Sequence, residues 1–375
     1  MEEPLISITV CVRDGVDWVD GCLKSLTQQT YPAIEILAVD DGSSDGSTEA
    51  LRQWHDPDGA RGPPVRVHCQ PTLGLSAGRQ WALENANGDW VAITDIDVRP
   101  EPDWIMNMMA ETTPVSEEER VVAVTGRTIF EQAEDTVSRL RSVEIAAKYR
   151  SRPRRTSLAN GPCSMFHRSS LLAIGGFDPE WYHAEDMEVS LRLIEAGGTI
   201  VYAPDALVRH VPEIGLKRFL SKRRRDARAH VRIVRHFPKR KRAGPGFDFL
   251  GSSAPVLILL PLWMVIGLCS LPFFGLLLTS EPTTLTDVMA WWQFKVLGAS
   301  FVFLLLHEIL LWRGPLGVVH RGLLRMDDRS KIIVILGVRR VTFLWSIALW
   351  IGLLYGIGDA LFARNGHNPW WRKSE

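Results

Sequence analysis

The chain is 375 residues long, and its equal numbers of acidic and basic side chains, 43 of each, conceal a strong asymmetry. Through residue 216 there are 34 acids against 19 bases, whereas from residue 217 onward there are 24 bases against 9 acids. The five cysteines have no short paired spacing, which argues against a disulfide framework and a thiolate zinc site. The first residues are acidic where a secretory signal is basic, so no cleaved signal is expected. The excess of basic residues after residue 216 predicts that this part of the chain has a membrane or another polyanion as its partner.

Strands and helices are predicted to alternate over the first 110 residues. Short apolar, β-branched runs predict strands at 5–12, 34–39, 65–68 and 90–94. Apolar residues at helical spacing predict helices at 16–30, 76–85 and 102–110. This alternation predicts an α/β fold with a mostly parallel, doubly wound sheet, whose ligands bind at the carboxyl ends of the strands.

The second part of the chain begins with charge and continues with apolar runs. Between residues 217 and 242 there are 13 Lys and Arg residues and one acid, Asp226. The apolar runs that follow predict about three membrane spans, at 254–279, 288–312 and 341–362. We therefore expect an α/β domain at 1–216, a basic juxtamembrane segment at 217–250, a transmembrane region at 251–363 and a short tail at 364–375.

Loop charge predicts how these spans are oriented. Residues 281–287 contain two acids and no Lys or Arg, whereas residues 313–340 contain seven basic side chains. The positive-inside rule then places the basic loops and the first domain in the cytoplasm, in an integral protein of the plasma membrane. Residues 314–338 are alternatively an amphipathic segment in the membrane interface. The segment at 217–242 lacks the aromatics of a single-strand platform, so membrane lipids rather than nucleic acid are its predicted partner.

Two acidic clusters follow predicted strands. Asp40 and Asp41 end the run at 34–39 and begin a turn rich in Gly and Ser. They are either ordinary turn and N-cap residues or carboxylates that accept the imide N–H of a pyrimidine base. Asp95 and Asp97 follow the run at 90–94 at spacing i, i+2, so their side chains point the same way in an extended segment. They are either a solvated turn or hard oxygen ligands for Mg2+ or Mn2+ that would hold a diphosphate.

A third acidic cluster, Glu185 and Asp186, opens the helix predicted from Met187 to Glu195. One interpretation is that these carboxylates stabilise the helix, because negative charge at a helix N-terminus interacts favourably with the helix dipole. The other is that one of them deprotonates an acceptor hydroxyl.

The order of these motifs, with Gly175-Gly176-Phe177-Asp178 before the third cluster, resembles the inverting glycosyltransferase family 2 over residues 4–212. The resemblance implies a Rossmann-like GT-A fold that binds a nucleotide-sugar. It implies that Asp41, with Asp14 and Asp40, contacts the nucleoside, and that Arg79 and Asp95 also bind the donor. Asp97, helped by Asp95, would hold Mg2+ or Mn2+, and Asp186 would be the base, with Glu185 orienting it or binding the acceptor. His210 is either a structural residue or a further metal ligand.

The predicted acceptor is a lipid. Arg152, Arg154 and Arg155 precede Asn160-Gly161 and either bind a lipid-linked phosphate or form a solvated loop. The Gln-x-x-Arg-Trp motif of processive synthases does not occur after residue 212, which favours a single addition. The sequence therefore predicts metal-dependent, inverting transfer of one hexosyl unit from a nucleotide-diphosphate sugar, with a UDP-sugar favoured, to a lipid-linked or other membrane-associated acceptor in glycan biosynthesis. A polyprenyl-phosphate sugar synthase and a non-catalytic membrane scaffold remain the alternatives.

Overall fold

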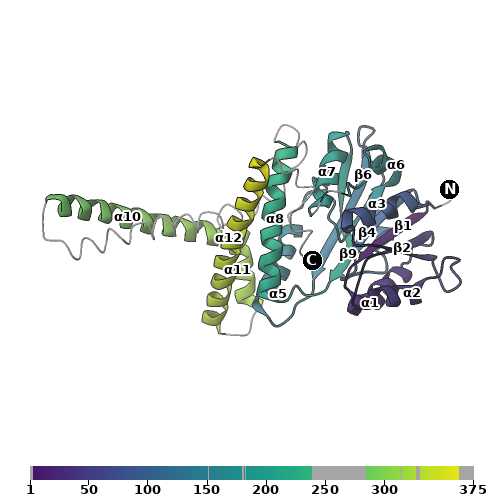
Figure 1. The fold of residues 1–375 in the computed structure, drawn as a ribbon, viewed down its shortest axis with the longest axis horizontal. Helices are drawn as coiled ribbons and strands as arrows, with labels where there is room; N and C mark the ends of the chain where they lie inside the picture. The colour runs from purple at the N-terminus through teal and green to yellow at the C-terminus, as the bar shows by residue number, and fades with distance from the viewer. Residues whose placement is uncertain are drawn as a thin grey trace.

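A computed structural model describes residues 3–362, except 151, 180, 182, 239–283, 314 and 327–329. One α/β domain contains all the strands of this part, and long helices from the C-terminal part stand beside it (Figure 1).

The N-terminal half of the domain is a doubly wound unit. Its elements are β1 Ile6–Val12, α1 Val16–Thr27, β2 Ile34–Asp41, α2 Ser47–Trp54, β3 Val65–Gln70, α3 Leu75–Asn85 and β4 Trp90–Asp95. The strands pair in parallel in the order β3-β2-β1-β4. The predicted strands and helices of this half are confirmed, and α2 is an additional helix that buries only Ser47 and Leu51.

The second half of the domain makes the sheet mixed. Its elements are β5 Val98–Pro100, α4 Trp104–Ala110, β6 Val121–Phe130, α5 Thr136–Arg150, β7 Arg155–Thr156, β8 Ser164–His167, α6 Arg168–Ala173, α7 Glu185–Glu195 and β9 Thr199–His210. Strand β8 lies antiparallel between β4 and β6, and β5 and β7 lie antiparallel to β9. Strands β6 and β9 pair in parallel, as β1 to β4 do, so the sheet is mixed rather than mostly parallel because β5, β7 and β8 run antiparallel to their neighbours. Hydrophobic periodicity identifies a strand but does not fix its direction.

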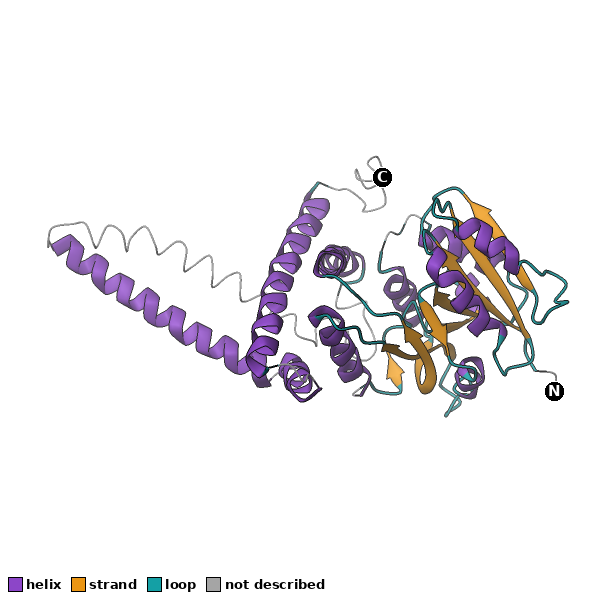
Figure 2. Cartoon of the chain, turned by 90° about the horizontal axis from the view of Figure 1, so that it is seen from below, coloured by secondary structure: helices purple, strands orange, loops and turns teal. Residues whose placement is uncertain are grey.

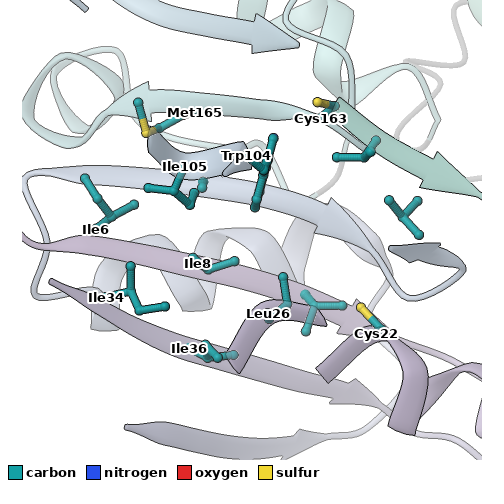
Figure 3. Packing of buried hydrophobic residues seen from close by; sticks show 14 of the residues in the cluster. Ile6, Ile8, Cys22, Leu26, Ile34, Ile36, Trp104, Ile105, Cys163 and Met165 are labelled. Carbon is teal, nitrogen blue, oxygen red and sulfur yellow. The ribbon is translucent and has the colours of Figure 1, made fainter. Parts of the chain in front are cut away.

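The central strands are buried on both faces. On one face, Ile6 and Ile8 of β1 pack with Cys22 and Leu26 of α1 and with Trp104 of α4 (Figure 3). On the other face, alternate residues of β2, such as Leu37 and Val39, belong to a cluster with residues of α3, which packs against β2. Burial on both faces explains why these strands are nearly continuous apolar runs rather than alternating ones.

A buried carboxylate joins the strands that carry the candidate site. Glu35 of β2 accepts hydrogen bonds from Ser7 Oγ at 2.6 Å, Asn87 N at 2.7 Å and Asn87 Nδ2 at 3.0 Å, and Arg66 Nη2 lies 2.9 Å from its Oε2. Burial alone would raise the pKa of Glu35, but the bonds from Ser7 and Asn87 and the charge of Arg66 together lower it. Glu35 therefore ties β1, β2 and β3 to the turn before β4.

We expect Glu35→Gln to lower the free energy of unfolding by about 1–3 kcal/mol, because the new amide N–H₂ faces donors instead of an acceptor. Since the folded-state pKa of Glu35 is lowered, its stabilisation is present above the pKa of the unfolded chain and fades as the pH falls below it. Chemical denaturation at pH 7 and pH 4 measures both effects. The exposed Glu49→Gln is the matched control, with an expected change within about 0.5 kcal/mol. Equal losses in the two variants would contradict this role.

The C-terminal helices pack on the domain at more than one place. They are α8 Leu216–His236, α10 Thr284–Arg313, α11 Pro315–Met326 and α12 Lys331–Leu361. Helix α8 lies along α12, and α11 packs against α5, while α10 projects away from the rest (Figures 1 and 2). Arg228 of α8 donates to both carboxylate oxygens of Asp359 at 2.6 and 2.9 Å.

One helix of the described part, α12, is long and apolar enough to cross a bilayer by length and composition. It contains almost all of the span predicted at 341–362, but it begins ten residues earlier, at Lys331. The span predicted at 288–312 falls within α10, and the one at 254–279 lies outside the described residues. The number of spans and the four-part division of the chain stay predictions.

Candidate active site

Two of the acidic clusters flank the carboxyl end of β1. Asp40 and Asp41 are the last residues of β2, and Asp95 is the last residue of β4. The strand register places Asp40 beside Val12 and Asp95 beside Cys11, with β1 between the two neighbours. This is the edge at which an open α/β sheet binds its ligands.

The Cys11 thiol lies at the meeting point of the clusters. Burial raises its pKa to about 12, and the charges that also act on it belong to Arg79, Asp95, Asp41 and Glu185. Carboxylates from all three acidic clusters of the sequence therefore lie around Cys11 at this edge of the sheet.

Asp41 is held in one orientation by the segment that follows β3. Its Oδ1 accepts hydrogen bonds from Gln70 Nε2 at 2.7 Å and from Leu73 N at 2.8 Å, and its Oδ2 accepts from Gly74 N at 2.9 Å. Gly74 has φ of +100°, a conformation that favours glycine. A carboxylate offers about four acceptor positions, so the buried Asp41 retains capacity for one more donor.

Asp40 and Asp14 shape the turn that follows β2. Asp40 Oδ2 accepts from Thr48 Oγ1 at 2.7 Å, and Asp14 Oδ1 accepts from Ser44 N at 2.8 Å and Ser44 Oγ at 3.2 Å. Asp45 bonds Ser47 and the first backbone N–H of α1. These bonds are those of an ordinary turn, and they fold it against the loop after β1.

Arg79 joins the second and third acidic clusters. Its side chain is 2 % exposed, with Nη2 3.0 Å from Asp95 Oδ1 and Nη1 2.7 Å from Glu185 Oε1. Arg79 was predicted to bind the donor, but in the structure its guanidinium is engaged by these two carboxylates. Its observed contacts therefore join the end of β4 to the start of α7.

Asp186 lies beside this pair in the first turn of α7. Its Oδ2 accepts from Gly161 N at 3.0 Å and its Oδ1 from Met187 N at 2.8 Å. Burial, followed by the negative charge of Glu185, raises the pKa of Asp186 to about 6, although Arg79 and the two backbone N–H groups oppose the shift. The sequence did not indicate the contact with Gly161, which depends on how the loop before β8 folds.

Asp97 meets His210 because β5 pairs with the end of β9. Asp97 Oδ1 lies 3.5 Å from His210 Nε2, and His210 Nδ1 donates to the Val211 carbonyl at 2.8 Å. With its proton on Nδ1, a neutral His210 presents the Nε2 lone pair to a carboxylate, so two acceptors face each other. A cation between them would satisfy both, and a backbone bond to the other ring nitrogen is typical of metal-ligating histidines.

This pair fits a divalent ion that is completed by its ligand. Among the described residues, no group of three or more His, Cys, Asp or Glu side chains is placed to hold a metal. Mg2+ sites commonly use one or two carboxylates together with substrate phosphates and water, and imidazole also suits transition metals. Asp95, the predicted helper, is paired with Arg79.

Comparisons with known proteins bear on the family and the fold. The sequence model of the family described as "Glycosyl transferase family 2" matches residues 7–175. We call these residues, which are similar to glycosyltransferase family 2, the family 2 domain.

Relatives match parts of the family 2 domain. The chain is 35 % identical to a putative glycosyltransferase, EpsH, of Bacillus subtilis (strain 168) over 109 residues. These residues make up 29 % of this chain and 30 % of that protein. It is 25 % identical to the pre-mycofactocin glycosyltransferase of Mycobacterium tuberculosis over 58 % of this chain and 45 % of that one. The match therefore spans less than half the length of either relative.

A solved structure has the same fold. It is the mannosyltransferase PcManGT from Pyrobaculum calidifontis in complex with GDP-Man and Mn2+, with a TM-score of 0.53 and 16 % identity over 97 % of this chain and 88 % of that one. The predicted GT-A fold is confirmed.

The basic loop of the family 2 domain has internal partners. Arg154 and Arg155 contact the buried Glu119 at 2.8 and 3.1 Å. Arg152 donates to Thr156 Oγ1 and the Leu158 carbonyl, and it lies over the Tyr149 and Tyr202 rings. These contacts are structural, so the predicted lipid-phosphate role of this loop receives no support from its geometry.

We expect Arg79→Met to lower the free energy of unfolding of the family 2 domain by about 3 kcal/mol, because it leaves the Asp95 and Glu185 carboxylates without their cation. Chemical denaturation at pH 7 measures the loss. Arg52→Met, which alters an exposed helical arginine, is the control and should change stability by less than about 0.5 kcal/mol. A loss below 1 kcal/mol for Arg79→Met would show that the site does not depend on this guanidinium.

Proposed function

We propose that this protein is a membrane-attached, metal-dependent, inverting glycosyltransferase that moves one sugar from a nucleotide-diphosphate sugar to a lipid-linked or other membrane-associated acceptor. The observation that carries the proposal is the pair of contacts from Arg79 to Asp95 and Glu185. They join the end of β4 to the start of α7, which carries the candidate base Asp186. The GDP-mannose and Mn2+ of the structural neighbour support this class of donor and ion; a UDP-sugar stays the favoured donor on the family resemblance.

The donor would lie along the carboxyl ends of β1, β2 and β4. Asp41, oriented by three protein donors, would accept the imide N–H of the base, with Asp40 and Asp14 shaping the nucleoside pocket. Asp97 and His210 would hold Mg2+ or Mn2+, and the bound ion would neutralise charge on the leaving diphosphate. Arg79 would hold Asp95 and Glu185 in place through its two ion pairs.

Asp186 would remove the acceptor proton. A general base works best with a pKa near the working pH, and burial raises the pKa of Asp186 to about 6. The acceptor oxygen would attack the anomeric carbon opposite the departing diphosphate, which inverts the configuration. A polyprenyl phosphate is already ionised and needs no such base, so the raised pKa favours a hydroxyl acceptor.

A membrane location rests on the C-terminal helices. Helix α12 has the length and composition of a span, and large apolar side chains are exposed on α12 and α10, among them Ile332, Leu336, Leu354, Trp291, Trp292 and Phe294. Lys295 lies over the Trp291 ring at 3.4 Å, an aromatic and cationic pair suited to a headgroup region. If the helices are oriented as the charge of their loops predicts, the family 2 domain would lie on the cytoplasmic side of the plasma membrane.

Asp186→Asn tests the base. Because the pKa of Asp186 is raised to about 6, the ionised base is lost as the pH falls, and kcat of the wild type should decline below about pH 6. The amide cannot take a proton, so kcat should fall by about 10²–10⁴-fold. Release of nucleoside diphosphate from a panel of UDP- and GDP-sugars with Mn2+ gives the rates between pH 5 and 8. Asp205→Asn, an exposed carboxylate, should keep the wild-type profile. Wild-type rates in Asp186→Asn would remove Asp186 from the mechanism.

Asp97→Asn tests the ion. A ligand present at 100 times its dissociation constant stabilises the fold by about 2.7 kcal/mol. Thermal unfolding of the wild type with the same sugar panel should therefore show a Mn2+-dependent increase in Tm for the true donor. Asp97→Asn should lose the Mn2+-dependent part, while the exposed Asp58→Asn should retain it. An undiminished Mn2+ effect in Asp97→Asn would place the ion elsewhere.

A further inference from the structure

The residues just before the candidate base adopt a conformation that side chains disfavour. His183 and Ala184 both have φ of +62°, in the left-handed region, and Ala184 is the N-cap of α7. A residue with a Cβ in this region costs free energy and persists where surrounding contacts hold it. Two such residues in succession set the direction in which α7 leaves, and with it the position of Asp186.

Helix α8 supplies contacts that hold this segment. Asp226 Oδ1 lies 2.6 Å from His183 Nε2, and Arg232 Nη2 donates to the His183 carbonyl at 2.9 Å. The Arg232 guanidinium also lies 4.4 Å from the centre of the Trp181 ring. On the opposite side, Ser76 of α3 donates to the Trp181 carbonyl at 2.7 Å. The approach to α7 is thus fixed between α3 and α8.

Asp226 is suited to this contact by its own surroundings. It is the one acid among the 13 basic residues of 217–242, and Arg223 Nη2 lies 3.1 Å from its Oδ2. Burial alone would raise its pKa, but Arg223 and His183 lower it strongly, so the carboxylate is ionised at neutral pH. A basic helix that served only to attract lipid headgroups would gain nothing from a buried carboxylate on its domain-facing side.

We propose that His183 and Asp226 are positioning residues for sugar transfer: their contact holds the segment before α7 so that Asp186 faces the acceptor hydroxyl. The inference rests on the proposed function, in which Asp186 is the base. It goes further because it gives the basic helix a task within the reaction. Helix α8 also pairs with α12 through Arg228 and Asp359, so the same helix holds both the base segment and the candidate membrane span.

The test uses the full-length chain in detergent with three variants. Asp226→Asn removes the charge without changing size. His183→Asn keeps a residue that tolerates positive φ but is too short to reach Asp226. The third variant combines both changes, and Asp58→Asn is the control. Release of nucleoside diphosphate is measured with Mn2+ and the best of UDP-glucose, UDP-GlcNAc and GDP-mannose, to separate kcat from KM for the donor. Hydrogen exchange of residues 184–190 is measured on the same proteins.

Each single variant should lower kcat about 10-fold or more while KM for the donor stays within about twofold, because the donor edge is untouched and small misplacement of a catalytic group is costly. The double variant should lose no more than the worse single variant, since both remove one contact. Exchange at 184–190 should be faster than in the wild type and in Asp58→Asn. Wild-type kcat in both single variants, additive losses or unchanged exchange would overturn the inference.

The two proposals fail in different ways. If the wild type and Asp186→Asn release nucleoside diphosphate at equal rates, the proposed base is wrong. Hydrogen exchange then still decides whether Asp226 holds the segment. If Asp186→Asn is inactive while both single variants keep wild-type kcat, only the positioning role is excluded.

Discussion

The contacts of Arg79 with Asp95 and Glu185 connect parts of the molecule that the chain leaves far apart. Its guanidinium is almost fully buried, with one carboxylate from the end of β4 and one from the start of α7. In a medium of low dielectric constant, a charge without its partner is costly, so each member of such a network constrains the other two. The position of α7, and therefore of Asp186, is fixed relative to the donor edge of the sheet.

The same edge of the sheet has more negative charge than Arg79 can neutralise. Asp41, Asp95, Glu185 and Asp186 lie around Cys11 and Arg79, and the pKa of Asp186 rises to about 6 as a result of burial and of the neighbouring Glu185. This imbalance has two chemical consequences. It leaves Asp186 able to accept a proton near neutral pH, and in the proposed mechanism it would favour a divalent cation between Asp97 and His210 when a diphosphate binds.

The sequence was sufficient for the first four strands and for the acidic motifs, but not for the later strands or for the partners of the motifs. Apolar runs predicted β1 to β4, and the carboxylates at the ends of β2 and β4 follow from the geometry of parallel strands. The antiparallel strand β8 was not predicted, since its four residues, Ser164–His167, are too short a run to show a periodicity. Arg79, predicted to bind the donor, contacts Asp95 and Glu185, which are distant in sequence and become neighbours only after the sheet and α7 pack together.

The partners of the charged residues in the basic segments could not be predicted from the sequence either. Arg154 and Arg155 were predicted to bind a lipid phosphate, whereas in the structure both form ion pairs with Glu119. Asp226 looked like an exception in a cationic helix, and in the structure it contacts His183 beside the candidate base. Glu119 and His183 are distant in sequence from the basic residues and the acid that they contact, so local composition cannot reveal these pairs.

The most direct test of the account is the position of a bound ion and donor. Crystals of the full-length chain grown with Mn2+ and its best nucleotide-sugar, measured at the manganese absorption edge, would locate the ion by anomalous scattering. The account predicts a peak bonded to Asp97 and His210 and to the diphosphate, with the anomeric carbon facing Asp186. An ion bound away from Asp97 and His210, or a sugar facing away from Asp186, would contradict it.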